Sequence, residues 1–339
     1  MVNDADASDA YQRAQENEAA IMDQVYSGAF DHLFKHPLRD LRFSTTVDDV
    51  SRFTKFVAID WSGASGEHLK GIAVAECDAD SASPRVLAPP PKGWSRGAIL
   101  DLLNAYAEAQ TPALIGFDFS PSLPFVRQGA YFPGWGQSPT DMRSLWSLVD
   151  EICASDRHFG VGSFVDHEHA SEHFRGPGRV GTAFEAGRGR LRICEEQQVK
   201  AKLSPSICFN LIGAAQVGKS SLTGMRVLNR LAGRVPLWPL DPVPASGPYL
   251  VEIYTTIAAR EAARPLGRSK VRTQVELDAA LAELGVSEPA ETSALDDHTT
   301  DALITAVWLR RAASRMALWH PADMTPDIAR TEGWTFGVT

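Results

Sequence analysis

Three short apolar segments of the chain each carry one acidic residue at or near an end. Residues 56–59 (FVAI) run into Asp60, residues 114–117 (LIGF) run into Asp118, and residues 249–256 (YLVEIYTT) contain Glu252. A carboxylate within an apolar strand is unfavourable unless it is paired or binds a metal. One such acid could be a cap or a buried hydrogen-bond acceptor, but three of them favour a shared site.

A second group of acids stands at the start of a predicted helix, residues 294–312. Apolar residues recur there at helical spacing from 303 to 308, after Asp297, His298 and Asp301. Asp297 and Asp301 are four residues apart and share a helix face, which Ile304 and Trp308 continue. The later turns can therefore pack on a sheet while the first turns hold carboxylates at the strand ends. The simpler alternative is that the acids only favour the helix N-terminus through its dipole.

Clustered carboxylates repel one another unless cations neutralise them. Carboxylate oxygens are hard ligands that suit Mg²⁺ or Mn²⁺. Two such ions, bridged by shared carboxylates, can activate water and stabilise the leaving oxygen of a phosphodiester. The acids therefore predict a Mg²⁺ or Mn²⁺ site with hydrolytic chemistry.

Composition limits the class of protein. The chain has 339 residues, 44% of them hydrophobic and 22% charged, as in a globular protein with a core of ordinary size. Its formal net charge of −9 argues against a general polyanion binder. The four cysteines are scattered without a CxxC pair, no signal peptide is evident and no apolar run could span a membrane. We expect a cytoplasmic protein with reduced thiols.

Positive charge is concentrated between residues 175 and 234. This segment holds eleven Lys or Arg residues and three acids. It could be an ordinary solvated surface, balanced by acids elsewhere. Alternatively, it is a phosphate-facing region on an otherwise acidic protein, which predicts nucleic acid as the partner.

The order of predicted elements indicates an α/β fold. We expect residues 1–50 to form a polar, helical N-terminal arm, residues 51–339 to form the main domain, and residues 125–203 to be a long insertion with one clear helix near 140–154. Three early strands without intervening helices predict antiparallel neighbours and hence a mixed sheet. The predicted strands are 53–60, 69–78, 83–91, 112–118, 206–213, 249–256 and 333–338, and the further helices are 95–109, 218–233 and 272–285.

Five stretches resemble the successive motifs of the predicted RNase H-like nucleases, a domain-of-unknown-function family similar to the RuvC branch of the RNase H-like fold. They are FVAIDWSG, LIGFDFSPSLP, VEIYTT, DDHTTDALITAVWLRR and EGWTFGV. The resemblance runs from about residue 53 to residue 338 and is weak over residues 125–203. It implies an RNase H-like mixed five-stranded sheet flanked by helices.

The resemblance also implies roles for individual residues. Asp60 would be the bridging metal ligand, and Asp118 the second acid, at a position where RuvC-like enzymes usually carry Glu. Asp301 would be the helix ligand, with Asp297 or His298 as its companion. We therefore expect four acids to be the metal ligands, namely Asp60, Asp118, Asp297 and Asp301. His298 and Glu252 would orient ligands or water.

Residues 213–220 (GAAQVGKS) fit the GxxxxGK[ST] pattern of a nucleotide phosphate loop. Lys219 and Ser220 would then contact phosphate, between a predicted strand and a predicted helix. No apolar strand ending in Asp follows as a metal-binding partner, since VPLWPLD is interrupted by proline. A milder interpretation is that Lys219 and the helix N-terminus bind a phosphate of the substrate.

The favoured function is a metal-dependent nuclease that acts on DNA or RNA. The first alternative is a nucleotide-binding ATPase or phosphotransferase that uses residues 213–220. The loop DWSGAS, residues 60–65, also resembles the first phosphate loop of the actin and sugar-kinase ATPases. The second alternative is a catalytically silent nucleic-acid-binding module.

Overall fold

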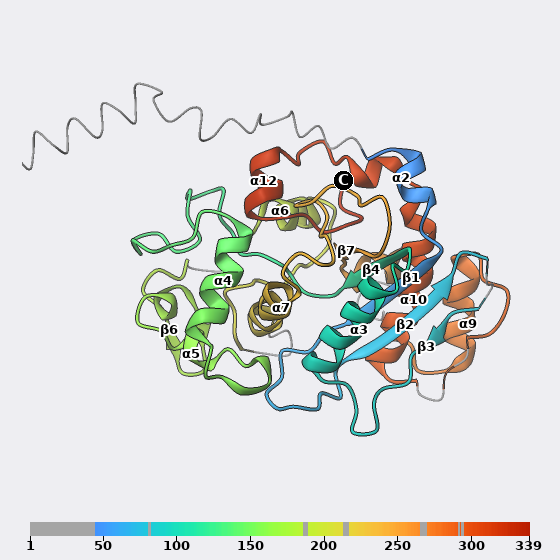
Figure 1. Cartoon of the computed structure of the whole chain (residues 1–339), viewed down its shortest axis with the longest axis horizontal. Coiled ribbons are helices and arrows are strands. Elements are labelled where there is room, and N and C mark those ends of the chain that lie inside the picture. Colours follow the sequence, from blue (N-terminus) through green and yellow to red (C-terminus); the bar gives the residue numbers. More distant parts are fainter. Residues whose placement is uncertain are drawn as a thin grey trace, which may run out of the picture. The chain divides into compact units, whose positions relative to one another are not determined.

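The structure is a computed structural model that describes residues 45–80, 83–185, 189–212, 217–264, 270–290, 292 and 295–339 (Figure 1). Thr45–Thr339 forms one compact unit. Residues 1–44, most of the predicted N-terminal arm, lie outside the described part. Val47–Ser51 forms helix α2.

A five-stranded sheet with the order β3-β2-β1-β4-β7 organises this unit. Strands β1, β4 and β7 are parallel, whereas β2 is antiparallel to β1 and β3 to β2. The prediction of a mixed, five-stranded α/β sheet is confirmed. The strands are β1 Lys55–Asp60, β2 Ala73–Asp78, β3 Arg85–Val86, β4 Ala113–Phe117 and β7 Tyr249–Glu252.

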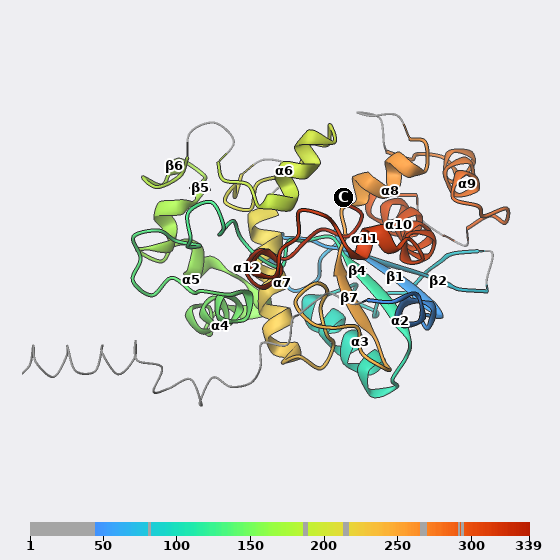
Figure 2. The same ribbon diagram turned by 90° about the horizontal axis from the view of Figure 1, so that it is seen from above.

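The central strands are apolar on both sides because helices cover both faces of the sheet (Figure 2). On one face, Val57 and Ile59 of β1 belong to the same core cluster as Ile99 and Leu103 of helix α3, Arg96–Glu108. Side chains of a strand alternate between the faces, so these two β1 residues point to the same side. The amphipathic pattern predicted for residues 95–109 is thereby confirmed as helix α3.

Helix α10, Asp297–Ala313, covers the opposite face. Its residues from Thr299 onward are almost all buried, as expected for a helix that is apolar on most sides. The Cys77 thiol of β2 lies 3.3 Å from the Ala306 carbonyl oxygen in the middle of α10. The exposed residues of the helix therefore lie in its first turn, where the acids stand, and near its C-terminal end.

The remaining elements surround this three-layered centre. In both views α4 and α5 lie with α7 beyond the β7 side of the sheet (Figures 1 and 2). None of the helices in the described residues combines the length and apolar character that a membrane span requires. The elements are α4 Met142–Ile152, η1 Arg157–Phe159, α5 Gly162–Val165, η2 Ala170–His173, β5 Arg175–Gly176, β6 Arg179–Val180, α6 Ile193–Lys200, α7 Val217–Leu231, α8 Thr255–Glu261, α9 Gln274–Glu283, α11 Met316–Trp319 and α12 Pro326–Thr331.

Two predicted strands are wrong. Residues 206–212 form turns with a single bridge, Arg175↔Asn210, because the position beside β4 is taken by β7. Their apolar side chains instead fill the core between α7 and the insertion. Residues 333–338 make one bridge to the edge of β7, Glu252↔Thr335, and the chain then turns at Gly337, whose φ is +99°.

Candidate functional site

The three acids of the apolar strands meet at one edge of the sheet. Asp60 is the last residue of β1, Asp118 directly follows β4, and Glu252 is the last residue of β7. These strands are parallel, so their carboxyl ends lie together. The Asp118 amide donates a hydrogen bond of 3.0 Å to the Ile59 carbonyl, which places Asp118 beside Asp60.

Helix α10 brings its first turn to the same edge. The Asp296 side chain caps the helix, accepting a hydrogen bond of 3.0 Å from the Thr299 amide, as expected for an acid at this position. His298 Nδ1 lies 2.9 Å from Asp60 Oδ2. This hydrogen bond is the main cause that raises the pKa of His298, so the protonated imidazole is favoured and donates to Asp60.

Asp301 follows one turn later and belongs to the same cluster. Burial, then repulsion from the Asp60 carboxylate, raises its pKa to about 7. Burial, followed by repulsion from Asp60, Asp301 and Glu252, raises the pKa of Asp118 well above its ordinary value. Burial also raises the pKa of Asp60, although the His298 hydrogen bond opposes this shift. The structure thus brings Asp60, Asp118 and Asp301 together.

This cluster predicts a pH-dependent stability. The folded protein holds a proton on Asp301 up to about pH 7, whereas an unfolded chain releases it near pH 4. The folded state binds more protons in that window, so stability falls as pH rises through it. We expect the free energy of unfolding of Asp301→Asn to exceed that of the wild type by up to about 4 kcal/mol at about pH 8, and by less at about pH 5.

Urea unfolding at both pH values, with EDTA present, measures this difference. The control is Asp323→Asn, which changes an exposed acid outside the cluster. An Asp301→Asn variant whose pH profile parallels that of the wild type would contradict the raised pKa of Asp301.

Asp297 is placed differently from Asp301. Its carboxylate forms ion pairs with Lys270 and Arg272, and its side chain is 24% exposed. These pairs lower the pKa of Asp297, with the Lys270 hydrogen bond as the largest cause. Asp297 lies near Asp301, but two cations already neutralise it.

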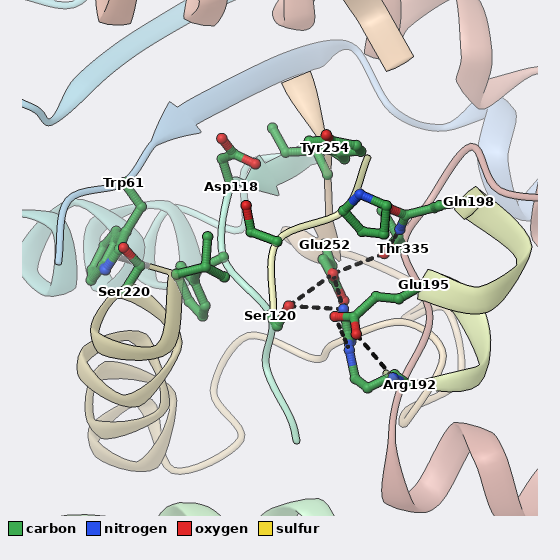
Figure 3. Close-up of a pocket in the computed structure, with 15 residues that line it drawn as sticks. Trp61, Asp118, Ser120, Arg192, Glu195, Gln198, Ser220, Glu252, Tyr254 and Thr335 are labelled. Atoms are coloured by element: carbon green, nitrogen blue, oxygen red, sulfur yellow. Dashed lines mark hydrogen bonds and ion pairs between the residues drawn. The ribbon is translucent and has the colours of Figure 1, made fainter. Parts of the chain in front are cut away.

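Glu252 is also neutralised, although it lies at the predicted edge. Arg192 donates to both of its carboxylate oxygens, at 2.8 and 2.5 Å, and both side chains are almost fully buried. The Thr335 hydroxyl donates a further hydrogen bond of 2.8 Å to Glu252. Arg192 also bonds to Glu195 at 2.9 Å and to the Ser120 hydroxyl at 2.8 Å. In Figure 3 the dashed lines join these side chains, and none reaches Asp118.

A cavity of about 270 Å³ lies between this network and Asp118. Asp118 and Tyr254 line it on one side, and Trp61 and Ser220 line it on another (Figure 3). It therefore gives access to Asp118 from the side of α7. Three further residues that line the cavity were not predicted as site residues: Ser120, Arg192 and Glu195. Only the excess of positive charge in residues 175–234, which include Arg192, could have indicated one of them.

Lys219 and Ser220 lie in the first turn of α7. Residues 213–216, the first half of the predicted phosphate loop, lie outside the described residues. The predicted strand before the loop is wrong, so the strand–loop–helix context of a nucleotide phosphate loop is missing. Ser220 lines the cavity that contains Asp118, and Lys219 faces a second cavity.

Gly63 allows the loop after β1 to approach α7 closely. A Cβ at Gly63 would lie 2.6 Å from the Ser220 amide nitrogen and 2.8 Å from its hydroxyl. We expect Gly63→Ala to lower the free energy of unfolding by about 1–3 kcal/mol, because the loop or the helix must shift. Thermal and urea unfolding measure this loss.

The matched control for that substitution is Gly136→Ala, where a Cβ would meet nothing within 4 Å. Equal effects of the two substitutions would show that the close approach of Gly63 does not limit the packing.

Much of the basic segment supports the fold instead of facing solvent. Arg226 is buried and pairs with Asp150 at 2.9 Å, and Arg190 is buried against the backbone carbonyl oxygens of Ala130 and Tyr131. Arg192 holds the network described above. The predicted phosphate-facing region is therefore reduced to a few side chains around α7 and β6.

No group of three or more His, Cys, Asp or Glu side chains in the described residues is arranged to hold a metal ion. Asp60, Asp118 and Asp301 are nevertheless carboxylates without a Lys or Arg ion-pair partner among the described residues. Mg²⁺ commonly binds one or two carboxylates and completes its shell with water and substrate phosphate. The donor set fits such an ion.

Comparison of the chain with family models, with curated proteins and with solved structures found no match.

Proposed function

We propose that the protein is a metal-dependent phosphodiesterase of RNase H-like fold that hydrolyses DNA or RNA. The observation that carries the proposal is the cluster of Asp60, Asp118 and Asp301 at the carboxyl edge of three parallel strands. Burial, and after it repulsion from neighbouring carboxylates, raises the pKa of Asp118 and of Asp301, and a divalent cation would relieve the repulsion. Such perturbed carboxyl groups beside a cavity are typical of functional sites.

The arrangement of the sheet supports the fold that the resemblance implies. Three antiparallel strands come first, two further parallel strands extend the sheet from β1, and a helix brings its acids to the edge. Asp60 stands at the end of the central strand of the five, and its charge acts on both Asp118 and Asp301. This position suits the ligand shared between two ions.

Asp60, Asp118 and Asp301 would hold Mg²⁺ or Mn²⁺. When bound, such ions activate a water molecule and stabilise the leaving oxygen of a phosphodiester. His298 fixes the orientation of Asp60 through its hydrogen bond of 2.9 Å. Ser220 and Tyr254 line the approach to Asp118 and would contact the substrate beside the scissile bond.

Incubation of labelled single- and double-stranded DNA and RNA with the protein tests this function. Cleavage is expected with Mn²⁺ or Mg²⁺, none is expected with EDTA, and Asp118→Asn should abolish it. A folded wild type that binds these nucleic acids but cleaves none of them with either metal would favour the silent binding module. Metal-dependent turnover of ATP that Lys219→Ala removes would favour the phosphotransferase alternative.

A further inference from the structure

A second cavity, of about 530 Å³, lies on the other side of the contact between Gly63 and α7. The loop that follows Asp60, Gly63 to Gly66, forms one wall, and Lys219 of α7 forms another. Four cationic side chains line the cavity, with Asp166 as its one acid; they are Arg96, Arg157, Arg179 and Lys219.

Arg96 is the most unusual of these residues, because it is only 2% exposed and has no acidic partner among the described residues. Its guanidinium donates to three backbone carbonyls, those of Ser62 and Ala64 at 2.7 Å and that of His158 at 3.1 Å. Its Nε–H is buried and has no hydrogen-bond partner within the described part of the chain. Burial, together with repulsion from Arg226, lowers the pKa of Arg96 to about 10.

A buried guanidinium without a counter-charge is unfavourable unless an anion binds beside it. Two of the other cations in the cavity are available for that anion. Lys219 and Arg157 have no ion pair or side-chain hydrogen bond within the described ranges, whereas Arg179 is bonded to Asp166 at 2.8 Å. Lys219 also stands in the first turn of a fifteen-residue helix, where the dipole favours negative charge.

We propose that this cavity binds a phosphomonoester dianion. A phosphate monoester carries a charge of about −2 near pH 7, whereas each internal phosphate of a strand carries −1. Four cations, one of them the buried Arg96, against one acid suit the dianion better. The cavity is also large enough for a terminal nucleotide.

Identification of the ligand as the terminal phosphate of a nucleic-acid strand rests on the proposed function. The wall formed by Gly63 to Gly66 begins three residues after Asp60, and Lys219 adjoins Ser220, which lines the cavity of Asp118. A strand anchored here by its terminal phosphate would place a nearby internal phosphate at the carboxylates. The substrate class is therefore an end-phosphorylated strand.

Fluorescence anisotropy in EDTA, where no hydrolysis occurs, tests this inference. The probes are one single-stranded sequence with a 5′-phosphate, with a 3′-phosphate or with hydroxyls at both ends. We expect the wild type to bind one phosphorylated form about tenfold more tightly than the hydroxyl form, and inorganic phosphate to remove the preference.

Lys219→Ala and Arg157→Ala should each lower that ratio severalfold, because each removes a cation that lacks a structural partner. Arg311→Ala is the matched control, since Arg311 is exposed near the far end of α10. Arg96 is not substituted in this test, because its hydrogen bonds to the carbonyl oxygens of Ser62, Ala64 and His158 also hold two loops in place.

Equal affinity for all three strands, with no binding of inorganic phosphate by calorimetry, would overturn the inference. Binding of inorganic phosphate that Lys219→Ala weakens, without any preference among strands, would support the phosphate site and assign it to small phosphorylated molecules. Asp60→Asn should keep the preference for a phosphorylated strand. Loss of cleavage therefore tests the proposed function, and loss of this preference tests the cavity.

Discussion

Replacing Arg192 with methionine is expected to lower the free energy of unfolding by about 3–5 kcal/mol. The guanidinium is 1% exposed and pairs with both oxygens of Glu252 and with Glu195. Methionine fills a similar volume but leaves two buried carboxylates without a counter-charge. Urea unfolding with fluorescence detection measures the loss.

Two controls separate the buried network from a general effect of removing an arginine. Arg127→Met breaks an ion pair with Glu196 at the surface, where the arginine side chain is 63% exposed, and it should change stability far less than Arg192→Met does. The double variant Arg192→Met, Glu252→Gln should be more stable than Arg192→Met alone, since one uncompensated charge is removed. A single Arg192→Met variant as stable as the wild type would show that Arg192 does not neutralise these acids.

Replacing Asp60 with asparagine is expected to lower metal-dependent hydrolysis by about 10²–10³-fold, which corresponds to about 3–4 kcal/mol of transition-state stabilisation. Asp60 is 8% exposed, and its charge acts on both Asp118 and Asp301. Asparagine keeps the shape and one oxygen but removes the charge that would hold a cation. Initial rates of cleavage, at saturating Mn²⁺, measure the effect.

His298→Ala should have a smaller effect, about 10-fold, because His298 acts on the site through Asp60. Asp323→Asn, at an exposed acid outside the cluster, should leave the rate unchanged. If Asp60→Asn retained the wild-type rate while folded, Asp60 would not be a metal ligand.

Local patterns were sufficient to predict the centre of the fold. The apolar run before Asp60, the run before Asp118 and the helical spacing after Asp301 each identify an element that the structure contains. Acids at the ends of such strands also predicted the shared edge, because parallel strands bring their carboxyl ends together.

Contacts between residues far apart in the chain could not be predicted from local sequence patterns. Glu252 meets a partner 60 residues earlier in the chain, so a carboxylate expected to act on ligands is held by Arg192 instead. Residues 206–212 have the apolar content of a strand, but nothing in their own sequence shows that β7 takes the place beside β4. Nothing in the local sequence distinguishes Arg96, the buried cation of the second cavity, from an ordinary residue at the start of a helix.

Calorimetric titration with Mn²⁺, in the presence of a strand that cannot be hydrolysed, tests most directly whether the three acids form a metal site. The strand supplies the phosphate oxygens that complete the shell of an ion held by one or two carboxylates. We predict that the wild type binds Mn²⁺ and that Asp60→Asn binds it at least about 10-fold more weakly. Equal binding by the two proteins, or no binding by the wild type, would contradict the proposed site.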